Sequence, residues 1–158
     1  MIMNAMYCAD PPRDQCSFYT DCLEARYHCG SSGYPIGYGL TYCQMFSIER
    51  NKLSSRGQEW MLDTMQCLQR ALIPEATGSI TAAKSCETLN DKAFASHPAC
   101  YVNDGVCTLP LTDWIAIVEI VQIPTLFGSW EASLATVETG GGCAEFYAFL
   151  ITQIHILF

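Results

Sequence analysis

Ten cysteines in a chain of 158 residues are the feature that most restricts how this protein can fold. Cytosolic reductants keep thiols reduced, so cysteine usage this far above the ordinary level favours an oxidising compartment. The number is even, which allows every cysteine to pair within one chain, but counting alone leaves on the order of a thousand pairings open. We therefore expect a secreted protein with five disulfides, whose connectivity the count does not give.

The N-terminal residues, Met1 to Tyr7, carry no basic start, apolar stretch or cleavage site of the kind that marks a secretory signal. We therefore expect this chain to be a mature fragment or the product of an incomplete gene model. A cytosolic protein is the alternative.

The charge balance excludes two classes of partner. A net charge of -8 with only eight Lys and Arg would repel the phosphates of nucleic acid and anionic lipid, so we expect no nucleic-acid partner. No stretch of 18 apolar residues occurs, so we expect no membrane span, and no Asn-x-Ser/Thr sequon is present for glycosylation.

The apolar residues recur at helical rather than strand spacing, and half of the chain is apolar, enough for one core. The sequence predicts an all-α fold, a compact disulfide-stapled bundle of about five to six short helices. The expected helices cover residues 15–29, 38–50, 55–73, 81–97, 112–123 and 129–138.

Local signals predict where these helices begin and end. Ser55 with Gln58 forms a capping box for the third helix, and Pro74 closes it. Pro98 is expected to end the fourth helix, because the residue before a proline avoids helical geometry. Thr112 is expected to cap the fifth.

The chain divides at its last cysteine. Residues 1–143 are expected to form one disulfide-rich helical domain, while residues 144–158 are almost continuously apolar and lack a cap or turn. This tail is either intron-derived or mispredicted sequence, or a buried terminal helix. A GPI signal after the glycines at 140–142 would need a polar spacer that is missing.

No residue pattern predicts an enzyme, a cofactor or a metal site. Zinc sites typically use cysteine pairs two to four residues apart, and no CxxC occurs. His28 is next to Cys29, but neighbours on a helix face different directions, so a surface histidine beside a bridged cysteine is the better interpretation. His97 is expected to cap a helix end, and His155 lies in the apolar tail.

Other candidate groups have ordinary structural explanations. The turn at Asn103, Asp104 and Gly105 lacks the alternating ligands of an EF-hand. Four carboxylates are expected on solvated helix faces, namely Glu59, Asp63, Asp91 and Glu131. Three tryptophans lie on apolar stripes and are expected in the core, namely Trp60, Trp114 and Trp130.

Several short segments follow one another in a recognisable order: Cys22-Leu23-Glu24, Gly33-Tyr34, Cys43 with Phe46, Ser55 to Gln58 before Cys67, Cys100-Tyr101, Val106-Cys107, Ala116-Ile117, and Val121-Gln122-Ile123-Pro124 with Phe127. In this order the chain resembles the stanniocalcin family of secreted hormones, from Cys8 to Cys143. The resemblance implies five disulfide pairs, which are Cys8 with Cys22, Cys16 with Cys43, Cys29 with Cys86, Cys67 with Cys100, and Cys107 with Cys143.

The resemblance also implies a function. A stanniocalcin-like protein would be a secreted hormone or extracellular binding protein without enzymatic activity. It would act on a protein receptor or an extracellular protease and take part in calcium and phosphate homeostasis. The family's additional C-terminal cysteine is absent, so a monomer or a non-covalent homodimer is expected. The chain also lacks the basic clusters that binding to sulfated glycans would need.

Two other functions stay open. One is a secreted cysteine-rich effector or defence protein on the same scaffold. The other is a small secreted hydrolase such as a phospholipase, because a cysteine-flanked histidine, His28, lies near glycines, although the Asp that should follow this histidine is absent.

Overall fold

The computed structural model describes residues 7–121 and 144–157. Within them every regular element is a helix, so the predicted all-α class is confirmed. In chain order the elements are η1 (Tyr19–Glu24), α2 (Ala25–Tyr27), η2 (Tyr34–Leu40), α3 (Thr41–Ile48), η3 (Arg50–Lys52), α4 (Ser55–Arg70), α5 (Ile73–Thr77), α6 (Cys86–Asn103), η4 (Val106–Thr108), α7 (Leu111–Val121) and α10 (Ala144–Leu157).

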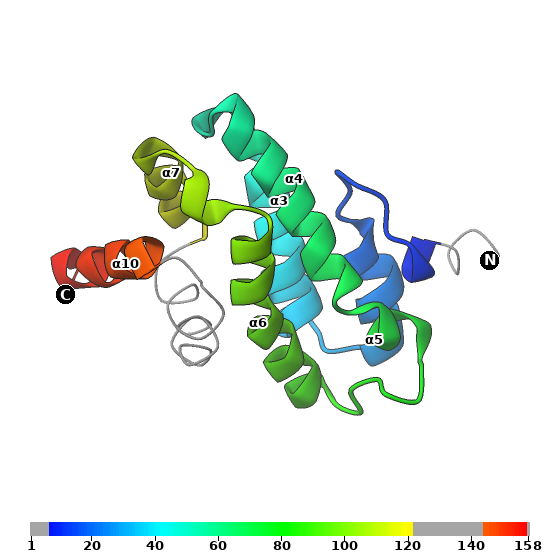
Figure 1. Ribbon diagram of the computed structural model, residues 1–158. Helices are drawn as coiled ribbons and strands as arrows, with labels where there is room; N and C mark the ends of the chain where they lie inside the picture. Colours follow the sequence, from blue (N-terminus) through cyan, green and yellow to red (C-terminus); the bar gives the residue numbers. More distant parts are fainter. Residues whose placement is uncertain (1–6, 122–143, 158) are drawn as a thin grey trace.

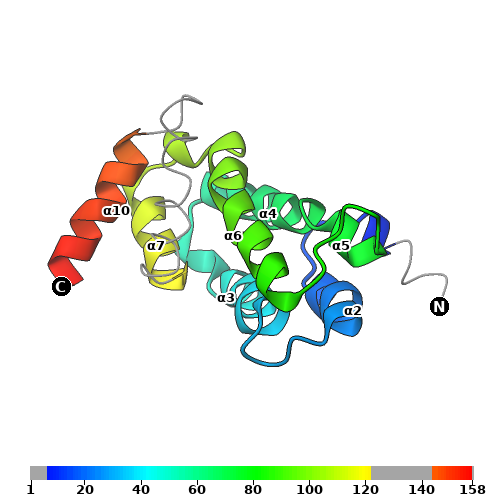
Figure 2. The ribbon, with the colours of Figure 1, turned by 90° about the horizontal axis from the view of Figure 1, so that it is seen from below.

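Helices α3, α4 and α6 form the centre of the molecule (Figure 1). The segment from residue 7, α2 and α5 lie at one end, and α7 and α10 lie at the other, so the first and last described residues are far apart (Figures 1 and 2). No described helix is both long enough and apolar enough to cross a bilayer.

Within residues 7–121 and 144–157, four disulfides join these helices. Cys8–Cys22 and Cys16–Cys43 fasten the N-terminal segment to η1 and α3. Cys29–Cys86 ties the end of α2 to the start of α6, and Cys67–Cys100 joins α4 to α6. These are four of the five pairs that the resemblance implies. The fifth includes Cys143, which lies outside the described residues.

The first two predicted helices are present with different boundaries and an unexpected geometry. The first consists of η1 and α2 and ends at His28, whose φ of 52° is left-handed. The second begins at Tyr34, four residues earlier than predicted. Both η1 and η2 are π-helical, and they pack so closely that a Cβ added to Gly39 would lie 2.3 Å from Cδ1 of Tyr19. A search for a period of 3.6 residues does not reveal the wider π turns.

The predicted end of the fourth helix is wrong. Helix α6 continues through Pro98 to Asn103, and it begins at Cys86, where the hydroxyl of Ser85 accepts from the amide of Thr88. A proline inside a helix removes one hydrogen bond, but tertiary contacts hold this helix on both sides of that point. Cys100 is bonded to α4, and Nε1 of Trp60 donates to the carbonyl of Tyr101 at 3.1 Å.

Two predicted caps are also wrong. Ser54, not Ser55, caps α4, and Gln58 donates instead to the carbonyl of Leu53. Thr112 lies inside the first turn of α7, which begins at Leu111 because the carbonyl of Pro110 accepts the amides of residues 113 and 114.

Pro74 does not close the third helix either. Helix α4 ends earlier, at Arg70, and Pro74 is in the first turn of α5, where its missing amide hydrogen costs nothing.

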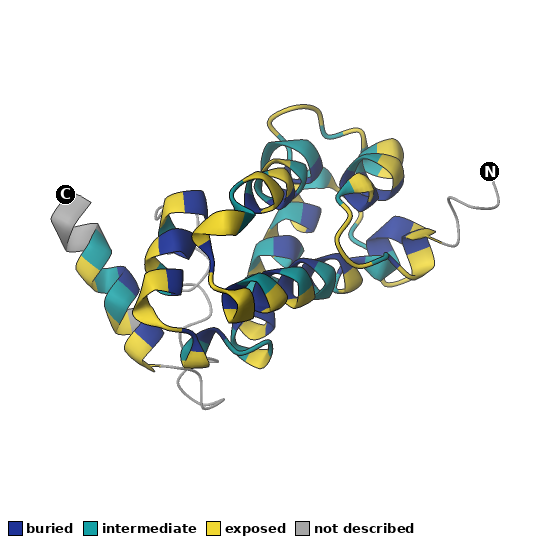
Figure 3. Cartoon of the chain, turned by 90° about the horizontal axis from the view of Figure 1, so that it is seen from above, coloured by how far each residue is buried: buried dark blue, intermediate teal, exposed yellow. Residues whose placement is uncertain are grey.

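The core lies between these helices, and the burial pattern in Figure 3 follows their inward faces. Trp60 is buried as predicted, with its ring centroid 5.0 Å from that of Tyr101. Trp114 is half-buried, and its ring centroid lies 5.4 Å from that of Phe146 in α10. Trp130, the predicted helix 129–138 and the predicted stop at Pro124 lie outside the described residues.

The apolar tail forms helix α10. Phe146 and Leu150 are completely buried, and Phe149 packs on Trp114 with a ring distance of 5.6 Å. In the structure this tail is a helix that packs on α7 through Phe146 and Phe149. The side chain of His155 is not among those described.

Candidate functional site

His28 does not form a nucleophile and base pair with its neighbour. The histidine is exposed in the turn after α2, and Cys29 is bonded to Cys86. A disulfide sulfur has no thiolate electron pair with which to attack a substrate. This geometry does not support the hydrolase hypothesis at His28.

The sequence predicted that His97 caps a helix end, which is wrong: His97 lies half-buried within α6. Its Nε2 is 3.2 Å from the hydroxyl of Tyr34, and its ring stacks on that of Tyr101. Burial lowers the pKa of His97 to about 4, and it raises the pKa of Tyr34 well above the ordinary value. All three side chains are therefore neutral near pH 7. The adjoining cavity of about 20 Å³ has room for one water molecule, so this is a polar contact of the core rather than a substrate site.

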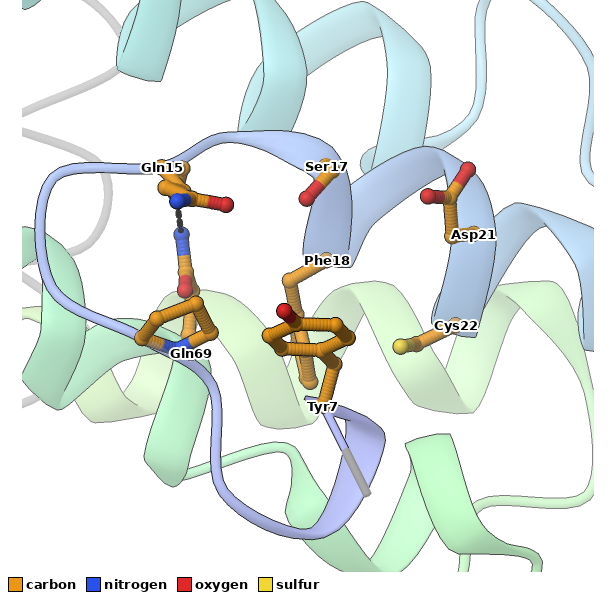
Figure 4. Close-up of a pocket in the computed structure, with 8 residues that line it drawn as sticks. Tyr7, Gln15, Ser17, Phe18, Asp21, Cys22 and Gln69 are labelled. Carbon is orange, nitrogen blue, oxygen red and sulfur yellow. Dashed lines mark hydrogen bonds between the residues drawn. The ribbon is translucent and has the colours of Figure 1, made fainter. Parts of the chain in front are cut away.

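A second small cavity lies under the N-terminal segment (Figure 4). Gln69 of α4 points to residue 15 and donates to the carbonyl of Gln15 at 2.8 Å, while Tyr7 lies beside Phe18. The cavity holds about 20 Å³, again the space of one water molecule. It has no room for an organic ligand.

The carboxylates of Glu59 and Asp63 on α4 are exposed, as predicted. Glu59 and Asp63 both bind Arg13, at 2.7 and 3.0 Å. Hydrogen bonds to these two carboxylates raise the pKa of Arg13, which keeps it charged at every physiological pH. Asp91 is exposed, as predicted, and Glu131 lies outside the described residues.

Beside Arg13 the surface is hollowed over about 500 Å³, along α4 and the end of α6. The hollow is open to solvent and carries charges of both signs, Asp63 and Asp104 against Arg70. Partial burial raises the pKa of Asp104. No group of three His, Cys, Asp or Glu side chains is placed to hold a metal ion among residues 7–121 and 144–157.

The strongest candidate for a binding site is the loop from Gly78 to Ser85, called here the 78–85 loop. It connects α5 to α6 at the edge of the molecule (Figure 2). Ile80 is 97 % exposed, more than any other large apolar side chain described, the next being Ile48 at 77 %. The residues around Ile80 are small, which allows another surface to approach the isoleucine closely.

Side chains from two other elements hold the base of this loop at Ala83. Glu75 of α5 accepts from the Ala83 amide at 2.6 Å, and Tyr27 of α2 donates to the Ala83 carbonyl, also at 2.6 Å. Glu75 is completely buried, and Nζ of Lys92 lies 2.7 Å from its Oε1. A buried carboxylate requires such partners, because burial without them is costly. The loop is therefore fixed before any partner binds.

The charge on the loop differs from that of the whole chain. Its eight residues include no Asp or Glu, and Lys84 is exposed. At its start the guanidinium of Arg26 covers Gly78 and donates to the carbonyl of Ala76 at 3.3 Å. A fixed, apolar tip with basic neighbours can dock on an acidic protein surface that has an apolar pocket.

Local sequence patterns do not identify this site. The loop letters, GSITAAKS, are typical of an ordinary connection. The hydrogen bond between Tyr27 and Ala83 distinguishes this loop from an ordinary connection. These residues are 56 positions apart, so a local sequence pattern cannot predict their contact.

A family model described as the Stanniocalcin family matches residues 14–136 of the chain. No curated protein and no solved structure matches.

Proposed function

The chain belongs to the stanniocalcin family, and we propose that it is a secreted, non-enzymatic binding protein that acts by docking its 78–85 loop on an extracellular protein partner. The family match supports the hormone-like role. The four described disulfides support an oxidising compartment, because disulfides persist in secreted proteins and are rare where cytosolic reductants act.

The observation that carries the docking proposal is the combination of Ile80 with the fixed Ala83. Ile80 has no packing role within its own chain, because it is almost fully solvated. Two side chains nevertheless hold the loop that displays it. Ordering a loop in advance lowers the entropic cost of binding, and an apolar side chain entering a pocket supplies the favourable term.

The finer parts of the proposal follow from the family. The partner is a receptor, or an extracellular protease that is inhibited by surface binding, and the outcome is a change in calcium or phosphate handling. The protein acts as a monomer or a non-covalent homodimer. Cys107 and Cys143 form the fifth disulfide, and residues 1–143 form the functional domain, on which α10 packs as a terminal helix.

The test is transport across an epithelium that handles calcium and phosphate. Oxidised protein is applied to its extracellular side, and tracer fluxes of both ions are measured for the wild type, Ile80→Asp and Ile48→Asp. Both substitutions place a charge at an exposed isoleucine, but Ile48 lies at the end of α3 and outside the loop. We expect the wild type and Ile48→Asp to change a flux, and Ile80→Asp to lose at least 10-fold in potency.

Each part can fail separately. A flux that does not respond to wild-type protein contradicts the role in ion handling. A flux that responds equally to Ile80→Asp contradicts the assignment of the loop and leaves the hormone-like role standing.

A further inference from the structure

The Cys29–Cys86 disulfide differs from the other three described disulfides in its exposure. Both of its cysteines are half-buried, whereas each of the others includes at least one fully buried cysteine. Gly30, next to Cys29, has open space where a side chain would be. Among the described disulfides, Cys29–Cys86 is therefore the one whose two residues both remain partly open to solvent.

The two sulfurs of this disulfide lie in opposite electrostatic environments. Cys86 is the first residue of α6, a helix of 18 residues, and the free amides at a helix N-terminus stabilise an anion. Cys29 faces the reverse situation, because the carboxylate of Glu24 accepts from the amides of Cys29 and Gly30, at 3.2 and 2.8 Å. Negative charge is thus favoured on the Cys86 sulfur and disfavoured on the Cys29 sulfur.

The Cys67–Cys100 disulfide provides the contrast within the same molecule. Cys67 borders the open hollow of about 500 Å³, so access on that side is not restricted. Yet Cys67 lies in the last turn of α4 and Cys100 in the last turn of α6, where the negative end of the helix dipole opposes a thiolate. Cleavage of this disulfide would leave an anion in an unfavourable place whichever sulfur departed.

We propose that Cys29 is a site of reversible modification by low-molecular-weight thiols through thiol–disulfide exchange. The sulfur of the attacking thiolate forms a new S–S bond with Sγ of Cys29. The Cys29–Cys86 bond breaks, and Cys86 departs with the bonding electron pair as a thiolate at the start of α6. Attack by the Cys86 thiolate on the mixed disulfide restores the original bond and expels the small thiol, so no external oxidant is needed.

The fold can tolerate this exchange. Helix α6 remains joined to α4 through Cys67–Cys100, and Ala83 remains bound by Glu75 and Tyr27. If the departing sulfur takes up a proton, the carbonyl of Tyr27 lies 3.6 Å away as an acceptor. The modification therefore frees the segment after α2 without detaching α6.

The experiment exposes the oxidised full chain to reduced glutathione in a nondenaturing buffer, stops the exchange by alkylation at successive times, and identifies the modified cysteines by peptide mass spectrometry. We expect the Cys29–Cys86 bond to be lost about 10-fold faster than Cys67–Cys100, because thiolate leaving groups in favourable environments depart faster. Early glutathione adducts should be on Cys29 and alkylated thiols on Cys86. Earlier loss of another disulfide, or adducts mainly on Cys86, would overturn the proposal.

Two variants test whether the charge environment at the start of α6, and not only the solvent exposure of the disulfide, sets the rate of exchange. Glu87→Gln removes a negative charge next to Cys86 in the first turn of α6 and should accelerate the exchange. Asp91→Asn removes an exposed charge on the same helix beyond that turn and should leave the rate unchanged. Equal rates for both variants would contradict the role assigned to the start of α6.

Discussion

Asp113 holds Ser54 at the start of α4, although 59 residues separate them in the chain. One carboxylate oxygen accepts from the Ser54 amide at 2.8 Å and the other from the Ser54 hydroxyl at 2.6 Å. The same hydroxyl oxygen accepts from the amide of Gly57 and so caps the helix. Because Asp113 belongs to α7, this contact fixes the position of α7 on the central helices.

Replacing Asp113 should therefore destabilise the protein. Asp113→Ala leaves the amide and hydroxyl of Ser54 without their acceptor and removes a negative charge from the start of α4, at a cost of about 1–3 kcal/mol. Thermal or urea denaturation measures the change in the free energy of unfolding. Asp91→Ala, at an exposed position of α6, is the matched control, and an equal loss in both variants would contradict this role of Asp113.

Gly57 lies in the first turn of α4, and replacing it with alanine should change the free energy of unfolding in the direction opposite to that expected from helix propensity. Alanine is the better helix former by about 1 kcal/mol, so propensity alone predicts that Gly57→Ala stabilises. A Cβ at this position would lie only 2.6 Å from Oδ2 of Asp113, so we expect Gly57→Ala to destabilise instead. Introduced into the Asp113→Ala background, the same substitution should become neutral or stabilising. A double-mutant cycle in urea tests this, and independent effects would contradict it.

The half-buried His97 should make stability depend on pH. Its pKa is about 4 in the folded protein and 6.5 when solvated, so the unfolded state binds the extra proton between these values. The contribution is fully present above pH 6.5 and is lost as the pH falls towards 4, by at most roughly 3 kcal/mol.

Urea denaturation at several pH values tests the prediction for His97. The variant His97→Phe should lose this part of the pH dependence, whereas His28→Phe, at an exposed position, should keep it. An unchanged slope in His97→Phe would show that other groups cause the dependence.

The packing of α10 predicts a large cost for removing Phe146. This side chain is completely buried against Trp114, and Phe to Ala substitutions in cores cost about 3–5 kcal/mol. Thr152→Ala, at an exposed position of the same helix, should change stability by less than about 0.5 kcal/mol. Tryptophan fluorescence and thermal denaturation report both, and a neutral Phe146→Ala would show that α10 does not pack on α7 in solution.

Local sequence patterns predicted the helical class and most helix positions, because apolar residues at spacings of three and four face the core. These patterns gave wrong helix ends and caps where contacts between residues distant in sequence determine the local structure. Pro98 is a helix breaker by itself, but the disulfide at Cys100 and the hydrogen bond from Trp60 keep the helix intact beyond it. Ser54 caps α4 in place of Ser55 because Asp113 binds it from α7.

The candidate site was not predictable for a related reason. Glu75 would be taken for a solvated carboxylate in any local analysis, yet it is completely buried and binds Ala83 and Lys92. Similarly, Glu59 and Asp63 converge on Arg13, some 50 residues earlier in the chain. Such pairs arise only when the chain is folded, so spacing along the sequence does not contain them.

The central claim is that this protein has a stanniocalcin-family scaffold whose disulfides suit it to the extracellular space. Disulfide mapping by mass spectrometry tests this claim most directly. The protein, oxidised and digested without reduction, should yield Cys8–Cys22, Cys16–Cys43, Cys29–Cys86 and Cys67–Cys100, the four disulfides with both cysteines among the described residues. It should also yield the proposed fifth pair, Cys107–Cys143. Free thiols or different pairs in protein recovered from extracellular medium would contradict the scaffold and the compartment together.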